Sequence, residues 1–304
     1  MTGGWGVLRA AGAGENASWP AIGGDMGYAE MPRFAADLVA PVRTVNAEGK
    51  GPFAFVVDHA SNRIPPQYGD LGLSPAERVR HIAWDPGALG VSLRLSELLD
   101  APVVHSTVSR LVIDCNRELH VDDLIPKVSE YTVIPGNAAV TPDDRASRIA
   151  GAYEPFHAAI EALLDRRQAA GMETILVCMH SFTPVFKGAA RRWPIGLIPP
   201  YTEAYTAALR DALAAEAPDL DIGWNEPYSA LRGVTQTLER HGDGRGLVAT
   251  MIEIRHDEIL EPNGLALWAS RLARCLDAAR GAMRGTPVHL SPPNIGAIRL
   301  EGRD

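Results

Sequence analysis

Val57-Asp58-His59-Ala60-Ser61-Asn62-Arg63-Ile64-Pro65 is the segment on which our interpretation of this sequence rests. It follows an apolar run, residues 53–57, whose length and β-branched and aromatic content predict a buried strand. Polar residues begin where the run stops, and the same change recurs at residues 110–117, 179–181 and 252–255. Because α/β enzymes place their chemistry at the carboxyl ends of sheet strands, we expect these segments to meet in one site.

The rest of the chain alternates strand and helix patterns without a linker, which predicts one α/β domain over residues 34–290. We expect a mixed central β-sheet flanked by helices on both faces. Residues 1–33 are predicted to be disordered, 118–142 to form a long loop over the site, and 291–304 to form an irregular tail. The expected strands are 53–57, 103–104, 111–113, 174–179 and 248–254, and the main expected helices are 86–99, 145–170, 201–216 and 265–283.

Charge and composition exclude some classes of function. The formal net charge of −8 argues against a nucleic-acid surface, because phosphate binding requires clustered Lys and Arg. The three cysteines, Cys115, Cys178 and Cys275, are widely spaced and form no CxxC, which favours reduced thiols in the cytoplasm. No apolar run approaches the roughly 20 residues of a membrane span, and the N-terminal residues lack a signal-peptide pattern. The sequence therefore predicts a cytoplasmic protein that binds neither nucleic acid nor a membrane.

Two histidines, His59 and His180, come directly after predicted strands, and imidazole is the usual nitrogen ligand of zinc. One such histidine alone is more often a hydrogen-bonded core residue, but two at strand ends favour a metal site. Asp85 is the best carboxylate candidate for a third ligand, although it is equally suited to cap the following helix. Asn62 lies one turn after His59, but a neutral amide is a poor zinc ligand. His241 is a further candidate for the site, and a surface loop position is its alternative.

Glu253 lies between two isoleucines in an otherwise apolar predicted strand, where an ionised carboxylate needs a partner. One interpretation is a buried ion pair with Arg255, whose side chain projects from the same face of the strand. The other interpretation, which we favour, is a general base that takes a proton from metal-bound water and passes it to the leaving nitrogen.

Arg110 precedes the apolar run 111–113, and Asn116 and Arg117 follow it closely. An arginine fork matches a carboxylate in bidentate fashion, and an asparagine amide adds another donor, so this segment is typical of a carboxylate-binding site. The alternative is a salt bridge from Arg117 to Asp114 or Glu118. A basic run shortly after the second histidine could hold another carboxylate or form a solvated loop: Lys187, Arg191 and Arg192.

Taken together, these segments resemble the N-formylglutamate amidohydrolase family. That family is related in fold to zinc carboxypeptidases and to aspartoacylase-type deacylases, so the resemblance implies a zinc-carboxypeptidase-like fold of the phosphorylase/hydrolase-like kind. The matching pieces occur in order over roughly residues 50–280: Asp58 to Asn62 with Ile64-Pro65, His81 to Asp85, Arg110 with Asp114 to Arg117, Met179 to Ser181, Asn225 to Tyr228, Arg240 to Gly242, and Ile252 to Arg255.

The resemblance also implies roles at the reacting centre. His59 and His180 would be zinc ligands, Glu253 would be the general base, and Arg110 would polarise the scissile carbonyl. The relatives place a glutamate three residues after their first histidine, where this chain has an asparagine. This departure leaves Asp85 as our candidate for the third ligand.

For the substrate, the resemblance implies that Asn116 and Arg117 hold the α-carboxylate, because a matching Asp-Leu-Asn-Arg stretch in the relatives binds a substrate carboxylate. Our hypothesis is the cleavage of N-formyl-L-glutamate to formate and L-glutamate, with about one zinc per chain. Arg255 or the basic run would receive the second carboxylate, and Asn62 and His241 would complete the substrate site. The alternatives are a deacylase of another N-acyl amino acid, a carboxypeptidase-like hydrolase, and a metal-free carboxylate-binding protein.

Overall fold

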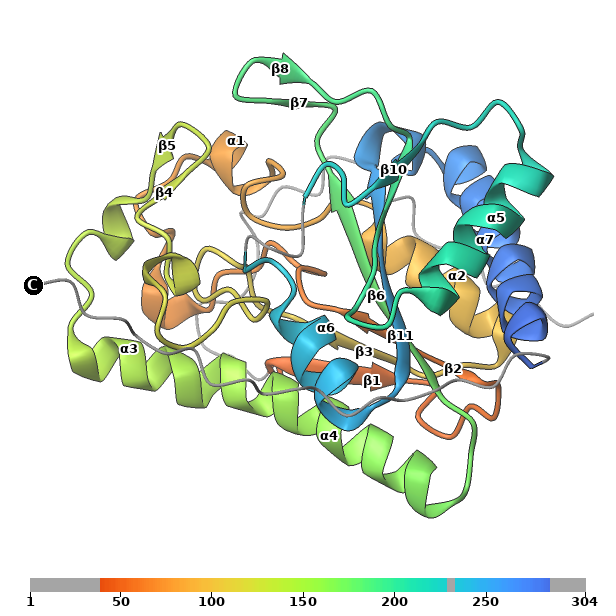
Figure 1. The fold of residues 1–304 in the computed structure, drawn as a ribbon. Helices are drawn as coiled ribbons and strands as arrows, with labels where there is room; N and C mark the ends of the chain where they lie inside the picture. The colour runs from red at the N-terminus through yellow and green to blue at the C-terminus, as the bar shows by residue number, and fades with distance from the viewer. Residues whose placement is uncertain (1–38, 229–232, 285–304) are drawn as a thin grey trace, which may run out of the picture. The chain divides into compact units, whose positions relative to one another are not determined.

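A sheet of seven strands runs through the part of the chain that the structure, a computed structural model, describes: residues 39–228 and 233–284 (Figure 1). The predicted disordered segment 1–33 and the predicted tail 291–304 lie outside these residues. The strand order is β1 (Val42–Val45), β3 (Val103–Ser106), β2 (Phe53–Val57), β6 (Ile175–Phe182), β11 (Val248–Arg255), β9 (Ile195–Ile198) and β10 (Ile222–Trp224).

The sheet is mixed, as predicted. Strands β3, β2, β6 and β11 are parallel to one another, so their carboxyl ends meet at one edge. Strand β1 is antiparallel to β3, and β9 is antiparallel to β11 while β10 is parallel to β9. Four consecutive parallel strands with both faces covered explain why these segments are continuous apolar runs rather than alternating ones.

Helices cover both faces of the sheet, which confirms the second part of the prediction (Figure 1). One face packs against α2 (Ala88–Leu99), α5 (Ala204–Glu216) and α7 (Pro262–Met283), and the other against α4 (Glu154–Ala169) and α6 (Gln236–His241). Successive strand residues point to opposite faces. In β2, Phe53, Phe55 and Val57 therefore join the core under α2, α5 and α7, while Ala54 and Val56 join the core under α4 and α6.

Three of the strands, β3, β6 and β11, extend further than predicted. The prediction ended at Met179, but β6 continues to Phe182, so that His180 lies within the strand and not after it. Glu253 likewise lies within β11 and is the register partner of His180 on the neighbouring strand. Both side chains therefore point from the sheet to the same face, the one covered by α4 and α6.

The prediction of a strand at residues 111–113 is wrong. This apolar run forms a turn and is buried in a third core cluster together with Tyr153. Side chains, not a neighbouring strand, satisfy its carbonyls: Asn137 Nδ2 donates to Leu111 O at 2.8 Å and Arg148 Nη1 donates to Val112 O at 3.0 Å. An apolar run alone does not distinguish these two ways of burying a backbone.

The segment predicted as a long loop, 118–142, contains a small hairpin of β4 (Val128–Ser129) and β5 (Thr132–Val133). A second hairpin, β7 (Val185–Phe186) with β8 (Ala189–Ala190), follows β6. Where one helix was predicted at 145–170, α3 (Pro142–Arg148), a π-helical turn (Ile149–Tyr153) and α4 run consecutively. The remaining α-helix, α1 (Pro75–Arg78), begins at a capping box made by Ser74 and Glu77.

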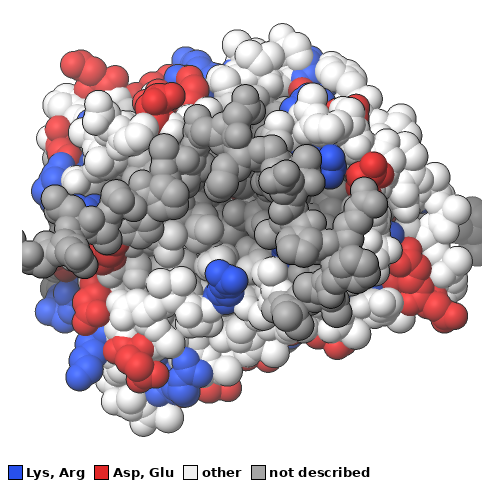
Figure 2. Space-filling view, turned by 180° about the vertical axis from the view of Figure 1, so that it is seen from behind, with Lys and Arg blue, Asp and Glu red and all other residues white. Residues whose placement is uncertain are grey.

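The composition-based predictions can be compared with the structure in three respects. All three cysteines are buried and free, which agrees with the prediction of reduced thiols. None of the helices in the described ranges combines the length and apolar character that a bilayer crossing needs. On the face drawn in Figure 2, the acidic and basic side chains that can be seen are interspersed, without a single basic patch of the kind a nucleic-acid backbone requires.

Candidate functional site

A pocket of about 220 Å³ opens at the carboxyl ends of β2, β6 and β11. It is lined by residues from each segment that the sequence singled out: His59, Arg110 with Asn116 and Arg117, His180, and Glu253. The remaining wall includes residues between 123 and 130, residues 182–186, and Tyr228. The convergence of distant segments on one pocket at the parallel strand ends agrees with what the sheet topology requires.

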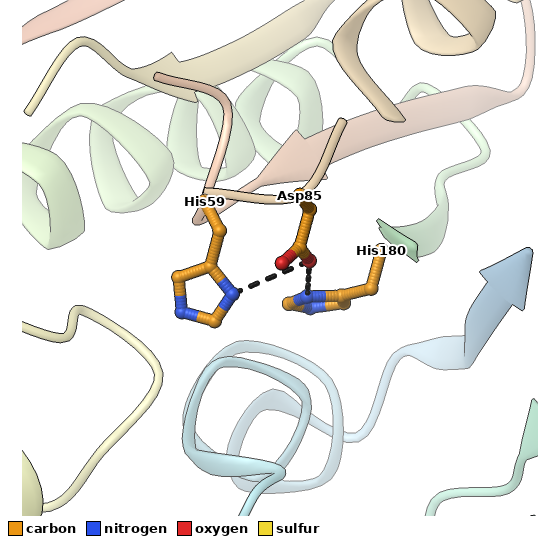
Figure 3. Close-up of side chains that lie close together, drawn as sticks. All are labelled: His59, Asp85 and His180. Atoms are coloured by element: carbon orange, nitrogen blue, oxygen red, sulfur yellow. Dashed lines mark hydrogen bonds and ion pairs between the residues drawn. The ribbon is translucent and has the colours of Figure 1, made fainter. Parts of the chain in front are cut away.

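His59, Asp85 and His180 come together on one side of this pocket (Figure 3). Asp85 Oδ2 lies 3.0 Å from His180 Nδ1 and 3.4 Å from His59 Nδ1. The ring centroids of the histidines are 5.1 Å apart, and one ligand atom from each of the three residues lies within 4.8 Å of the others. All three side chains are buried. These three residues could hold a metal ion, and two imidazoles with one carboxylate are a ligand set that zinc uses where it keeps a position open.

The second nitrogen of each of these rings faces another carboxylate. His59 Nε2 lies 2.7 Å from Asp114 Oδ1, and His180 Nε2 lies 3.2 Å from Asp58 Oδ2. A carboxylate that holds the far nitrogen of a ligating histidine fixes its tautomer and ring orientation and makes it more basic. This second layer of carboxylates indicates that the residues fit a divalent cation. A histidine that is only hydrogen-bonded in the core does not need a second carboxylate.

The side chain of Asp85 does not cap α2. Gly87 occupies the cap position of that helix, without a side-chain hydrogen bond, and Asp85 Oδ2 instead accepts from Ser181 N at 3.3 Å. The Asp85 backbone N–H donates to His59 O at 2.9 Å, which holds the carboxylate next to the first histidine. Arg110 Nη1 lies 3.4 Å from Asp85 Oδ1, and Arg110 Nη2 donates to Asp114 Oδ2 at 2.8 Å.

The carboxylates set the charge state of the two histidines. Burial alone would lower the pKa of His180, but the carboxylates of Asp58 and Asp85 beside its ring nitrogens outweigh burial and raise that pKa well above 6.5. Burial and Arg110 would also lower the pKa of His59, and Asp114 and Asp85 raise it. Without another cation, the cluster compensates its excess of carboxylate charge by taking up protons. A divalent cation would replace those protons, because ligating imidazoles are neutral.

Glu253 lies in the pocket beside His180 and is 5% exposed. Burial raises the pKa of its carboxyl to about 7; the charge of His180 acts against this increase, and that of Asp85 adds to it by less. Within the described residues its Oε2 has no hydrogen-bond partner. The alternative of a buried ion pair with Arg255 does not describe this structure, because Arg255 donates to Asp257 at 2.8 Å and to Glu258 at 3.0 Å. A carboxylate titrating near neutral pH, with a free oxygen in a pocket, has the properties of a general base.

Tyr228 also reaches the pocket, and Gly196 of β9 explains how. Gly196 is the register partner of Glu253, and a Cβ added to it would lie 1.8 Å from Glu226 O. The segment that follows β10 therefore crosses over Gly196 in direct backbone contact. Burial raises the pKa of the Tyr228 hydroxyl, with a contribution from the charge of Glu253.

Asn116 and Arg117 line the pocket, but both make contacts within the protein. Asn116 Nδ2 donates to Val234 O at 2.7 Å, and its Oδ1 accepts from Thr237 N at 3.0 Å. Arg117 Nε donates to Asp123 at 2.8 Å and not to either of the two neighbours that the alternative named. The side chain of Asp123 is 62% exposed, so solvent screens this pair and leaves the guanidinium available to a substrate carboxylate.

Three predicted site residues do not line this pocket. Asn62 Nδ2 donates to Arg78 O at 3.0 Å. His241 Nε2 lies 2.8 Å from His157 Nδ1 in a buried pair, not in a surface loop. Arg255 pairs outside the pocket, as described above. In each case the residue type matched the chemistry, but the direction of the side chain depended on contacts that the sequence does not show.

Sequence reasoning missed the roles of Asp58, Asp114 and Tyr228. The first two lie inside the motifs quoted above, and that place was the available signal. It does not show which histidine each carboxylate holds, because Asp58 is next to His59 in the sequence yet faces His180, and Asp114 faces His59 from 55 positions away. For Tyr228, no local signal was available beyond its place in a motif, because its position depends on the passage of the chain over β9.

The family model for N-formylglutamate amidohydrolase matches residues 51–260, more than half of the chain. The chain belongs to this family. The search among curated proteins finds no match. Among solved structures, the gene product Atu2144 from Agrobacterium tumefaciens is 38% identical, with a TM-score of 0.79 over 81% of this chain and 97% of that one. The N-formylglutamate amidohydrolase from Ralstonia eutropha JMP134 is 18% identical, with a TM-score of 0.59 over 81% of this chain and 100% of that one, and supports the fold alone.

The relation to zinc carboxypeptidases stays a prediction. A metallo-carboxypeptidase from Burkholderia cenocepacia is similar with a TM-score of only 0.32 and 11% identity, over 83% of this chain and 67% of that one. The family membership therefore rests on the family model, whereas the chemistry of the site rests on the geometry described above.

Proposed function

We propose that this protein is a metal-dependent amide hydrolase that cleaves N-formyl-L-glutamate to formate and L-glutamate. The observation that carries the proposal is the pair of imidazoles that converge on Asp85 while Asp58 and Asp114 hold their far nitrogens. Membership of the N-formylglutamate amidohydrolase family supports the choice of reaction. A deacylase acting on another N-acyl amino acid is the second candidate, because the same candidate metal ligands and pocket arginines would serve that reaction.

His59, Asp85 and His180 would hold the metal, and zinc suits a site of two nitrogen ligands and one oxygen ligand. When bound, such a cation polarises a carbonyl and lowers the pKa of a water from about 15.7 towards 7. The carboxylates of Asp58 and Asp114 would keep both rings neutral and correctly turned as the cation replaces their protons.

Glu253 would accept the proton of the attacking water and return it to the amide nitrogen as the C–N bond breaks, which releases formate and an amine. Its raised pKa suits both steps, because a base that titrates near neutral pH both takes up and gives back a proton readily. Arg110 would donate to the carbonyl oxygen as negative charge develops there. Its guanidinium carries five N–H donors, and the two neighbouring carboxylates engage two of its nitrogens.

Arg117 would hold the α-carboxylate of the substrate as a bidentate partner, with Asn116 fixing the segment on which it lies. The hydrogen bonds of Asn116 to Val234 and Thr237 tie this segment to the start of α6. Orientation by a charged clamp remote from the reacting bond is a large part of the rate enhancement in such enzymes.

The decisive experiment measures formate release from N-formyl-L-glutamate by metal-loaded protein, with and without a chelator, for the native chain and for Glu253→Gln. We expect the chelator to abolish turnover, and Glu253→Gln to lower kcat by roughly 10²- to 10⁴-fold while the metal content stays unchanged. Glu161→Gln, which alters an exposed carboxylate on α4, is the matched control and should retain full activity. An active Glu253→Gln variant would contradict the assigned base, and turnover that survives the chelator would contradict the metal.

A further inference from the structure

Two arginines among the described residues line the pocket, Arg110 and Arg117. Arg110 is engaged by the carboxylates of Asp85 and Asp114, so only Arg117 remains for a carboxylate of the substrate. N-formylglutamate has two carboxylates, and each needs a cationic or hydrogen-bonding receptor when it leaves water. If the proposed function is correct, the receptor for the second carboxylate must come from a residue next to the pocket.

Arg191 lies directly after β8 and packs against three aromatic side chains of the pocket wall. Its guanidinium carbon is 4.6 Å from the ring centroid of Phe186, 4.7 Å from that of Tyr228 and 5.7 Å from that of Phe182. Its Nη1 also donates to the Tyr228 hydroxyl at 3.1 Å. All three rings line the pocket, so the guanidinium is in contact with side chains of the pocket wall.

Among the described residues no carboxylate forms an ion pair with Arg191, in contrast to the other arginines of this region. Arg110, Arg117, Arg192 and Arg255 each pair with an acidic side chain of the protein. The aromatic faces attract the cation and restrict its orientation without neutralising its charge. A guanidinium held in this way keeps most of its N–H donors for a planar anion such as a carboxylate.

The backbone that carries Arg191 is fixed from two sides. Arg191 N donates to Pro184 O at 2.8 Å across the hairpin. On the other side, Arg255 Nη1 donates to Arg192 O at 2.9 Å and to Arg191 O at 3.3 Å. The charge of Arg255 is neutralised by Asp257 and Glu258, so its function in this structure is to hold a backbone and not to bind an anion.

We propose that Arg191 is the receptor for the side-chain carboxylate of the substrate, and that Arg255 is the residue that positions it. Arg191 thereby makes the pocket selective for N-acyl amino acids with an acidic side chain over neutral ones of the same shape. This inference rests on the proposed function, because it assigns the specificity of the same site.

The test compares kcat/KM for N-formyl-L-glutamate and N-formyl-L-glutamine, which differ in the charge of the side chain but hardly in size. We expect the native chain to prefer the glutamate substrate. Arg191→Gln should lower kcat/KM for the glutamate substrate by roughly tenfold to a hundredfold, mainly through KM, because a charged hydrogen bond is lost. The glutamine substrate should be nearly unaffected, and Arg191→Lys should restore part of the preference.

Arg192→Gln is the matched control, because the neighbouring Arg192 side chain is 75% exposed and pairs with Asp221, which does not line the pocket. Arg192→Gln should leave kcat/KM unchanged for both substrates. If Arg191→Gln instead lowers kcat/KM for both substrates by the same factor, Arg191 only orients Tyr228 and the inference is overturned. A preference for the glutamate substrate that persists in Arg191→Gln overturns it as well.

A binding measurement separates this inference from the proposed function. If the native chain releases formate from neither substrate, the proposed function fails, and calorimetry with N-acetyl-L-glutamate and N-acetyl-L-glutamine still tests Arg191. A preference for the dianion that disappears in Arg191→Gln supports the receptor. Equal binding of the two ligands to the native chain, or a preference that Arg191→Gln retains, excludes it.

Discussion

Two pairs of buried histidines in this protein have the same spacing, but the pKa of the rings is raised in one pair and lowered in the other. The ring centroids of His59 and His180 are 5.1 Å apart, and so are those of His157 and His241. The first pair is surrounded by Asp58, Asp85 and Asp114, which raise the pKa of both rings. Burial lowers the pKa of His157 to about 4 and that of His241 to about 3, in an environment that also contains Arg240.

The difference teaches that neighbouring carboxylates, and not burial or proximity, make a histidine pair suitable for a cation. In the second pair, His157 Nδ1 and His241 Nε2 face each other at 2.8 Å, and His157 Nε2 faces Cys115 O at 3.0 Å. One ring must donate and the other accept, so the hydrogen bond between the rings can form when both are neutral. In the first pair, both rings instead point their nitrogens at anions.

The largest expected effect is the loss of the metal from Asp85→Ala, because this change removes the carboxylate on which both rings converge. We expect the metal content to fall from about one ion per chain to near zero, together with activity. Elemental analysis of purified protein measures this, and circular dichroism checks that the variant is folded. His157→Gln, from the other pair, is the control and should keep its metal. Full occupancy in Asp85→Ala would mean that the carboxylate is not a ligand.

A smaller effect is expected when the outer carboxylates are changed one at a time. Asp58→Asn and Asp114→Asn should each weaken metal affinity by about 10- to 100-fold, because the rings lose the groups that orient them and increase their basicity. Competition with a chromogenic chelator measures the affinity. Asp123→Asn, which changes an exposed partner of Arg117, should leave the affinity unchanged. An unaltered affinity in both Asp58→Asn and Asp114→Asn would remove the distinction between the two histidine pairs.

The smallest effect concerns pH and the pair His157–His241. The folded-state pKa of each ring lies below its ordinary value of 6.5. Below pH 6.5 the unfolded chain therefore binds protons at these rings that the folded protein does not bind. The stability that this pair contributes is complete above pH 6.5 and decreases as the pH falls towards 4, with a slope that approaches roughly 1.4 kcal/mol per pH unit for each ring.

Two measurements check this prediction. Urea unfolding of the metal-free protein should show the decrease below pH 6.5, and His157→Gln should reduce its slope. The ring signals of His157 and His241 in NMR spectra should not titrate between about pH 5 and 8. Titration of either ring near its ordinary pKa would show that burial does not keep the pair neutral.

Much of this fold could be predicted from local pattern. Residues 53–57 were recognised as a strand because an apolar, β-branched run of that length has few other ways to be buried. The same argument failed at residues 111–113, where the side chains of Asn137 and Arg148 satisfy the carbonyls that a neighbouring strand would have paired. Local pattern reports how much of a segment is buried, but not which partner satisfies its backbone.

The sequence by itself determined which chemical groups are available at the strand ends, because residue type and strand periodicity are local properties. It also identified Asp85 as a candidate ligand, with a helix cap as the alternative. Only the tertiary structure decided between these, since Asp85 and His180 are 95 positions apart and their contact depends on how β2 and β6 pair. For the same reason, only the tertiary structure shows that Asn62 and Arg255 lie outside the pocket and that Arg191 packs against aromatic side chains of the pocket wall. Each of these outcomes depends on long-range packing, which no short segment of the sequence encodes.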